Sequence, residues 1–159
     1  QRTSKHGGRP MKLRREDGIA MAAYRGWKLF SIWRAVSEEY GHRFGGLCEV
    51  GINLGHSPVT WLEAQPNARV YLWDLGAVDD ELCGAVFGYL RGVYSERVTI
   101  VSGDSQHTLN DAAKANASNP FCDVVAVDGI KTYEGRLHDM HALRKISRPN
   151  AIWLLDDSR

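Results

Sequence analysis

Residues 47–58, which read LCEVGINLGHSP, constrain the fold of this chain more than any other segment. An apolar run leads to Gly51, and Gly55 follows four residues later. Ser57 is placed to cap a helix that begins at Pro58, because proline lacks only an N–H that has no partner in the first helical turn. The segment therefore predicts a strand, a tight glycine turn and a helix N-terminus, an arrangement that binds nucleotide-like ligands.

Glu49 narrows the class of ligand. It lies two residues before Gly51, where a carboxylate would repel a phosphate but would favour hydroxyl and ammonium groups. The segment therefore indicates a nucleoside without phosphates, such as S-adenosylmethionine. A nicotinamide-dependent oxidoreductase is the rival from another class. It would have a third glycine in this loop and a Tyr-x-x-x-Lys pair or similar, and the sequence has neither.

Length and composition favour one soluble, globular domain. The chain has 159 residues, 43% of them hydrophobic, and a formal net charge of +1, which gives no reason to expect nucleic acid as a partner. No apolar run is long enough to span a membrane. The three cysteines, Cys48, Cys83 and Cys122, are scattered singly, so we expect buried thiols in a reducing compartment and a cytoplasmic protein.

The order of elements predicts an α/β fold. Residues 1–10 are basic and glycine-rich and are expected to form a flexible arm, whereas residues 11–42 have mostly helical apolar spacing. The remainder of the single domain 11–159 is a predicted α/β core over residues 46–157. Five short apolar runs separated by helical segments predict a doubly wound, mostly parallel sheet. The expected strands are 47–51, 70–74, 97–101, 122–128 and 151–155, the expected helices between them are 57–64, 79–93, 106–117 and 133–145, and 148–150 is an expected turn.

Acidic residues occur at or just beyond the end of each expected strand. They are Glu49, Asp74, Asp104, Asp128 and Asp156. One or two acids could be explained by favourable charge at helix N-termini. Five at the same edge of one sheet favour a ligand site, because ligands bind beyond the carboxyl ends of parallel strands.

The chain resembles the class I S-adenosylmethionine-dependent methyltransferases of the Rossmann-like fold. The resemblance rests on the order of five motifs over roughly residues 45–157: the Glu-x-Gly-x-Asn-x-Gly-His-Ser loop, Asp-Leu-Gly after the second strand, Gly-Asp-Ser after the third, Val-Asp-Gly-x-x-x-Tyr-Glu after the fourth, and Asp-Asp after the fifth. The small-molecule type, with methyltransferase domain 24 and the cation-dependent O-methyltransferases, is the most similar.

The resemblance implies a role for each matching residue. The loop of Glu49, Gly51, Asn53, Gly55 and Ser57 would hold the methionine part of S-adenosylmethionine. Asp74 would accept hydrogen bonds from the ribose hydroxyls, and Asp104 or Ser105 would border the adenine. Asp128 would also contact the cofactor, and the expected acceptor is a small molecule.

Lys131 stands where this type of methyltransferase often has histidine. Asp128-x-x-Lys131 also resembles the cation-dependent catechol-type enzymes, in which the aspartate binds the cation and the lysine deprotonates the acceptor hydroxyl. Asp156 and Asp157 match the acid pair that completes such a site. The residues agree with this, because clustered carboxylates repel one another and a hard divalent cation such as Mg²⁺ relieves the repulsion. A solvated Lys131 and a capping role for Asp156 and Asp157 are the structural alternatives.

Members of this family continue beyond the fifth strand. We therefore expect the C-terminal strands to be missing, so that the chain is a fragment or a minimal fold. A non-catalytic or truncated domain that kept the fold is an alternative function. An exposed edge at the fifth strand could also support a homodimer.

Overall fold

A computed structural model of the chain describes residues 39, 44–52, 54–76 and 81–155, and these residues form one α/β unit. The expected arm 1–10, the expected helices of 11–42, Asn53, Asp156 and Asp157 lie outside the described residues. In chain order the elements are β1 (Gly46–Val50), α2 (His56–Ala64), β2 (Arg69–Asp74), α3 (Glu81–Tyr94), the 3₁₀ helix η1 (Ser95–Arg97), β3 (Val98–Ser102), α4 (Ser105–Asn116), β4 (Cys122–Val127), α5 (Tyr133–Ile146) and β5 (Ser147–Leu155).

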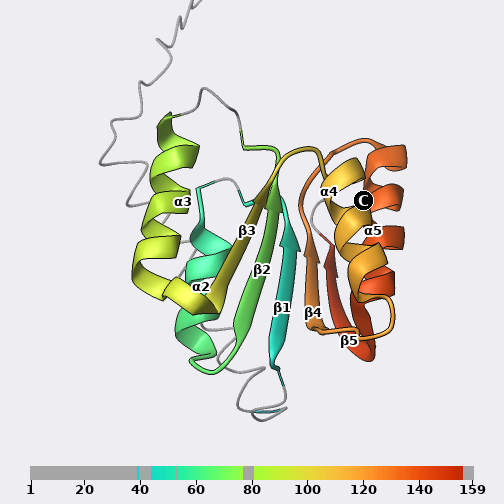
Figure 1. The fold of residues 1–159 in the computed structure, drawn as a ribbon, viewed down its shortest axis with the longest axis horizontal. Helices are drawn as coiled ribbons and strands as arrows, with labels where there is room; N and C mark the ends of the chain where they lie inside the picture. The colour runs from blue at the N-terminus through green and yellow to red at the C-terminus, as the bar shows by residue number, and fades with distance from the viewer. Residues whose placement is uncertain (1–38, 40–43, 53, 77–80, 156–159) are drawn as a thin grey trace, which may run out of the picture.

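The five strands form one parallel sheet in the order β3-β2-β1-β4-β5. Helices α2 and α3 lie over one face of the sheet, and α4 and α5 lie over the other (Figure 1). The predicted doubly wound fold is therefore confirmed. The strand order reverses at β1, so the loops after β1 and β4 diverge to opposite sides and leave room for a ligand between them.

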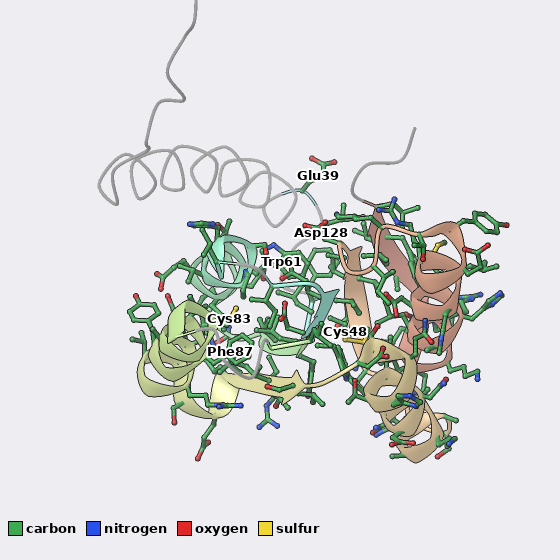
Figure 2. All side chains as sticks on the ribbon, turned by 90° about the horizontal axis from the view of Figure 1, so that it is seen from above. Glu39, Cys48, Trp61, Cys83, Phe87 and Asp128 are labelled. Carbon is green, nitrogen blue, oxygen red and sulfur yellow. A yellow bond between two sulfur atoms is a disulfide. The ribbon has the colours of Figure 1, made fainter. Side chains whose placement is uncertain are left out.

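Each face of the sheet has its own hydrophobic core, because successive side chains of a strand point to opposite faces. Leu47 of β1 packs in the core beneath α2 and α3, together with Trp61 and Phe87. Cys48 packs in the core beneath α4 and α5 with Leu143. Figure 2 shows this separation, with Trp61 and Phe87 on one side of the sheet and Cys48 on the other. The strands are covered on both faces, which explains their continuous apolar runs.

The last strand begins earlier than the sequence suggested. Residues 148–150 were predicted as a turn, but they lie within β5, which follows α5 directly. Ser147 pairs with Cys122, and the next paired residue, Ile152, is opposite Val124, so the intervening residues bulge out of the ladder. The turn-forming residues 148–150 lie in this bulge, and a bulge is a place where a strand tolerates proline.

Cys48 and Cys122 correct another expectation. Both are fully buried, as predicted, but they are joined by a disulfide and are not separate thiols. They are 74 residues apart in the sequence, yet they lie on the adjacent strands β1 and β4 with their Cα atoms 5.8 Å apart. The pairing depends on which strands are neighbours, so single scattered cysteines gave no signal of it.

Strand β5 forms one edge of the sheet, as expected for the fifth strand. Leu154 and Leu155 near its end are 36% and 39% exposed. A homodimer through this edge stays a prediction. Within the described part of the chain, no helix is long and apolar enough to cross a membrane.

Candidate functional site

The loop after β1 turns at two glycines with positive φ. Gly51 has a φ of 88°, and a Cβ atom there would lie 2.3 Å from the backbone oxygen of Asp128, so the loop after β4 can approach only a glycine. Gly55 has a φ of 74° and is the N-cap of α2. The predicted capping by Ser57 is wrong, because the left-handed backbone of Gly55 starts the helix at His56 and leaves Ser57 in the first turn.

Ser57 instead donates a hydrogen bond to Glu49. The distance from Ser57 Oγ to Glu49 Oε1 is 2.5 Å. Glu49 is 3% exposed, and its Oε2 is buried and has no hydrogen-bond partner among the described residues. Burial raises the pKa of Glu49 to about 8; the bond from Ser57 opposes the shift, and the charges of Asp128 and Asp74 add to it. The Oε2 atom of this carboxyl can thus accept a hydrogen bond from a donor group.

Asp74, the last residue of β2, holds the glycine loop in place. Its Oδ2 accepts a hydrogen bond from the Ile52 amide at 2.7 Å, and its Oδ1 accepts one from the Gly76 amide at 2.9 Å. Both bonds tie the end of β2 to the backbone of the two loops that border the cavity. The position is the one predicted for ribose recognition.

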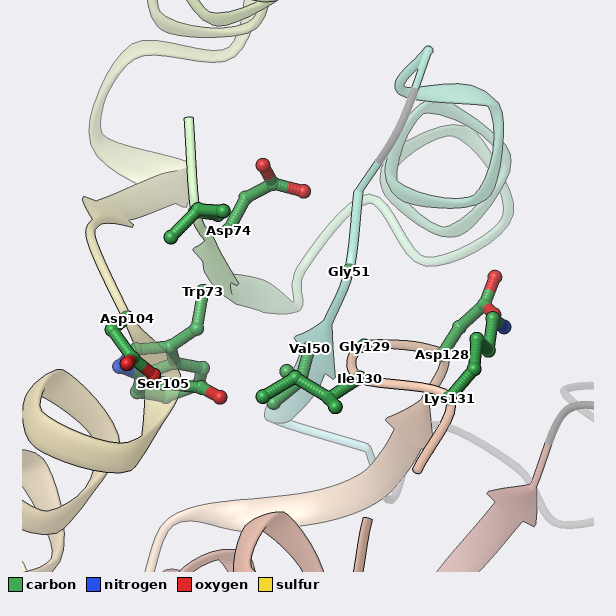
Figure 3. Close-up of a pocket in the computed structure, with 11 residues that line it drawn as sticks. Val50, Gly51, Trp73, Asp74, Asp104, Ser105, Asp128, Gly129, Ile130 and Lys131 are labelled. Atoms are coloured by element: carbon green, nitrogen blue, oxygen red, sulfur yellow. The ribbon is translucent and has the colours of Figure 1, made fainter. Parts of the chain in front are cut away.

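A cavity of about 670 Å³ lies beyond the carboxyl ends of β1, β2, β3 and β4 (Figure 3). Its volume is in the range that holds a cofactor or drug-sized ligand. Trp73, Asp104 and Ser105 gather at one side, whereas Asp128 and Lys131 are at the other. The lining residues are Val50, Gly51, Trp73, Asp74, Leu75, Asp104, Ser105, Asp128, Gly129, Ile130 and Lys131.

The cavity brings together six of the predicted site residues: Gly51, Asp74, Asp104, Ser105, Asp128 and Lys131. Glu49, Gly55 and Ser57 are not among the residues that line it. Three carboxylates against one ammonium make the lining acidic, which disfavours a phosphate ligand and agrees with the class of ligand predicted from Glu49.

Asp104 and Ser105 already have roles in the fold. Asp104 caps α4, because its Oδ1 accepts a hydrogen bond from the Gln106 amide at 2.9 Å. The Ser105 hydroxyl donates to Oδ1 of Asp139 at 2.7 Å. Both residues line the cavity, so a capping role and a ligand-facing position coexist here.

Lys131 contacts the carboxylate of Asp128 in an ion pair. The two side chains are 52% and 42% exposed, so the desolvated lysine considered from the sequence is not observed. The expected cation ligands Asp156 and Asp157 are outside the described residues. Among the residues that are described, no group of three His, Cys, Asp or Glu side chains is placed to hold a metal ion.

Two features of the site were missed in the sequence. The first is the apolar part of the cavity wall formed by Val50, Trp73 and Ile130. Val50 and Trp73 could have been found as the last apolar residues of their strands. The second is Asp139, a fully buried acid on α5. Its spacing of four and seven residues from the buried Leu143 and Ile146 was the available signal.

The open parallel α/β sheet, with a cavity at its strand ends, places the chain in the Rossmann-like class. Residues 48–158 match the methyltransferase domain family, and the chain belongs to this family. Membership argues against the nicotinamide-dependent oxidoreductase. No curated protein matches the chain.

Solved structures show the same fold at low sequence identity. CalS11, a TDP-rhamnose 3'-O-methyltransferase of calicheamicin biosynthesis, is 19% identical with a TM-score of 0.61 over 91% of this chain and 65% of its own. The Podospora anserina methyltransferase PaMTH1, solved with S-adenosylhomocysteine, is 20% identical with a TM-score of 0.60 over 83% of this chain and 51% of its own. MycE of mycinamycin biosynthesis, solved with Mg and S-adenosylhomocysteine, is 18% identical with a TM-score of 0.58 over 80% of this chain and 31% of its own. The chain thus spans between a third and two thirds of the length of these proteins.

Proposed function

We propose that this chain is the cofactor-binding part of an S-adenosylmethionine-dependent methyltransferase that methylates a hydroxyl group of a small acceptor. The observation that carries the proposal is the position of Asp74. It is fixed by two backbone amides at the end of β2 and faces a cavity large enough for a nucleoside. The family match and the acidic lining of the cavity, with Asp74, Asp104 and Asp128, support a cationic nucleoside as the ligand.

Under this proposal the chain binds the cofactor, orients it toward the acceptor and shields both from water. When bound, the cofactor supplies a methyl group on a positively charged sulfur. Asp74 accepts hydrogen bonds from the ribose hydroxyls, while Val50, Trp73 and Ile130 offer apolar surface to the base. Methyl transfer forms a bond from the acceptor oxygen to the methyl carbon as the bond from carbon to sulfur breaks. Correct placement of the acceptor oxygen is therefore most of what the protein must supply.

The proposed base is Lys131. In its neutral form it would take the proton of the acceptor hydroxyl through Nζ. Its position supports this role, because it lines the cavity and its side chain is 52% exposed, so that an acceptor can reach it.

We also propose that a divalent cation, Mg²⁺ by its preference for oxygen ligands, assists the reaction. Asp128 would hold it together with Asp156 and Asp157. When bound, the cation supplies positive charge that makes the acceptor hydroxyl easier to deprotonate. The Asp128 carboxylate suits this role, since it reaches the cavity and already attracts the cationic group of Lys131.

Calorimetry with S-adenosylhomocysteine tests the cofactor. We expect binding to the wild-type chain, and we expect Asp74→Ala to weaken it by at least about 1.4 kcal/mol, a tenfold change. Asp111→Ala is the matched control, because Asp111 is an acid on α4 whose side chain is 76% exposed. Binding of NAD with none of S-adenosylhomocysteine would contradict the proposal.

Activity tests the reaction and the cation. Labelled S-adenosylmethionine should methylate one member of a panel of phenols, sugars and carboxylates, and a chelator should abolish transfer. Turnover that survives both the chelator and Asp157→Ala would contradict the role of the cation. Turnover that survives Lys131→Ala would contradict the role of Lys131 as base. Cofactor binding without turnover on any acceptor would favour the non-catalytic alternative.

A further inference from the structure

A buried acid, Asp139, lies directly behind the cavity wall. It is in the second turn of α5 and is fully buried. Its Oδ1 accepts the hydrogen bond from the Ser105 hydroxyl at 2.7 Å, and Ser105 is the first residue of α4. Asp139 does not line the cavity, whereas Ser105 does.

The second oxygen of Asp139 lies against the loop on the other side of the cavity. A Cβ atom built on Gly129 would be 3.1 Å from Asp139 Oδ2, so this oxygen packs close to the backbone of the β4–α5 loop. Gly129 also lines the cavity. One carboxyl thus touches the start of α4 and the loop after β4, two segments that approach the ligand space from different strands.

The packing of Asp139 is costly for the fold alone. Its Oδ2 is buried and has no hydrogen-bond partner among the described residues. A buried polar atom without a partner destabilises the folded state, and an apolar side chain of the same size would avoid that cost. Such departures from good packing are expected where a residue serves a site. Burial raises the pKa of Asp139, and the hydrogen bond from Ser105 opposes the shift.

We propose that Asp139 is a positioning residue for the cofactor cavity: it holds the Ser105 hydroxyl and supports the Gly129 loop, so that both keep the shape the ligand requires. The inference rests on the proposed function in one respect, which is that the ligand is S-adenosylmethionine or its product. It does not depend on the acceptor, the cation or Lys131.

The test is a double-mutant cycle on the affinity for S-adenosylhomocysteine, measured by calorimetry below the unfolding temperature of every variant. Asp139→Leu removes the acceptor, and we expect it to weaken binding by at least about fivefold. Asp139→Asn keeps an acceptor oxygen in the same place, and we expect its affinity to stay within about twofold of wild type. In the Ser105→Ala background the hydrogen bond is already lost and only the support of the Gly129 loop remains, so Asp139→Leu should weaken binding by a smaller factor than it does in wild type.

Ser147→Ala is the matched control. Ser147 also has a buried hydroxyl, which donates to the Leu143 carbonyl at the other end of α5, away from the cavity. We expect this variant to lose stability and keep its affinity. If Asp139→Leu does not fold, Asp139→Thr replaces it, because a helical threonine can satisfy its hydroxyl on the preceding turn while it no longer reaches Ser105.

The outcomes separate the two proposals. Wild-type binding with unchanged affinity in Asp139→Leu or Asp139→Thr overturns the role of Asp139 and leaves the proposed function standing. Equal losses in Asp139→Asn and Asp139→Leu, or fully additive losses with Ser105→Ala, overturn it as well. No wild-type binding of S-adenosylhomocysteine defeats the proposed function, and the role of Asp139 falls with it.

Discussion

Ser57 Oγ and Glu49 Oε1 are 2.5 Å apart and join the first turn of α2 to the end of β1 from beneath the glycine loop. The contact changes how both residues are understood. Ser57 was predicted as a helix cap, but its hydroxyl donates to the buried carboxyl of Glu49, and neither residue lines the cavity. Contact between Glu49 and a ligand stays a prediction. Because burial raises the pKa of Glu49 to about 8, this carboxyl keeps its proton at a pH where an exposed glutamate has lost it.

The stability of the chain should depend on pH through Glu49. Its pKa is about 8 in the folded state against 4.5 for the unperturbed group, so the folded state binds the additional proton between these values. The stabilisation that this gives is complete below about pH 4.5 and is lost as the pH rises through about 8. We expect the free energy of unfolding of wild type, relative to Glu49→Gln, to fall by roughly 2–4 kcal/mol between pH 5 and pH 9.

Urea unfolding of both proteins at each pH measures this difference. Glu96→Gln is the control, because Glu96 is an exposed acid in the 3₁₀ helix η1. A constant difference between wild type and Glu49→Gln across this pH range would show that the Glu49 carboxyl titrates normally.

The disulfide between Cys48 and Cys122 predicts a thiol count. The denatured chain should react with a thiol reagent at one cysteine before reduction and at all three afterwards, as mass spectrometry would show. Reduction should also lower the free energy of unfolding by about 2–5 kcal/mol, because the bond closes a long loop in the unfolded chain. Three reactive cysteines without reductant would instead agree with the reducing compartment expected from the sequence.

Arg97 holds the C-terminal end of α2. Its guanidinium donates to the carbonyl oxygens of Leu62, Gln65 and Ala68 at 2.8, 2.7 and 3.2 Å. These carbonyls are at a helix end and in the turn that follows, where backbone acceptors lack partners within the helix. We expect Arg97→Met to lower the free energy of unfolding by about 2 kcal/mol, since bonds to charged donors are among the stronger ones.

Arg91→Met provides the comparison for Arg97. Arg91 is exposed, and its guanidinium donates a hydrogen bond of 3.3 Å to the Ile100 carbonyl. Thermal or urea unfolding should therefore give a clearly lower stability for Arg97→Met than for Arg91→Met. Equal losses in the two variants would contradict the role assigned to the three bonds.

The sequence predicted the parts of this molecule that depend on local pattern. The apolar runs located the five strands, and the rule that parallel strands point one way placed Asp74, Asp104 and Asp128 at one edge. What it missed depends on contacts between distant segments. The Cys48–Cys122 bond and the link from Asp139 to Ser105 require knowledge of which strands and helices are neighbours, and the β5 bulge requires knowledge of its pairing with β4.

Two glycines should respond to alanine in opposite directions. Gly88 is within α3, and a Cβ atom there would meet nothing within 4 Å among the described residues. Gly88→Ala should therefore raise the free energy of unfolding by about 0.5–1 kcal/mol through its better helix propensity. Gly55 has a positive φ of 74°, and its Cβ would lie 2.7 Å from Val86 Cγ1, so Gly55→Ala should lower it by about 1–3 kcal/mol. Urea unfolding of the two variants measures both changes. A loss of stability in Gly88→Ala would mean that a methyl group on this face of α3 displaces something in contact with it. An unchanged free energy of unfolding in Gly55→Ala would mean that the turn before α2 does not need its left-handed backbone.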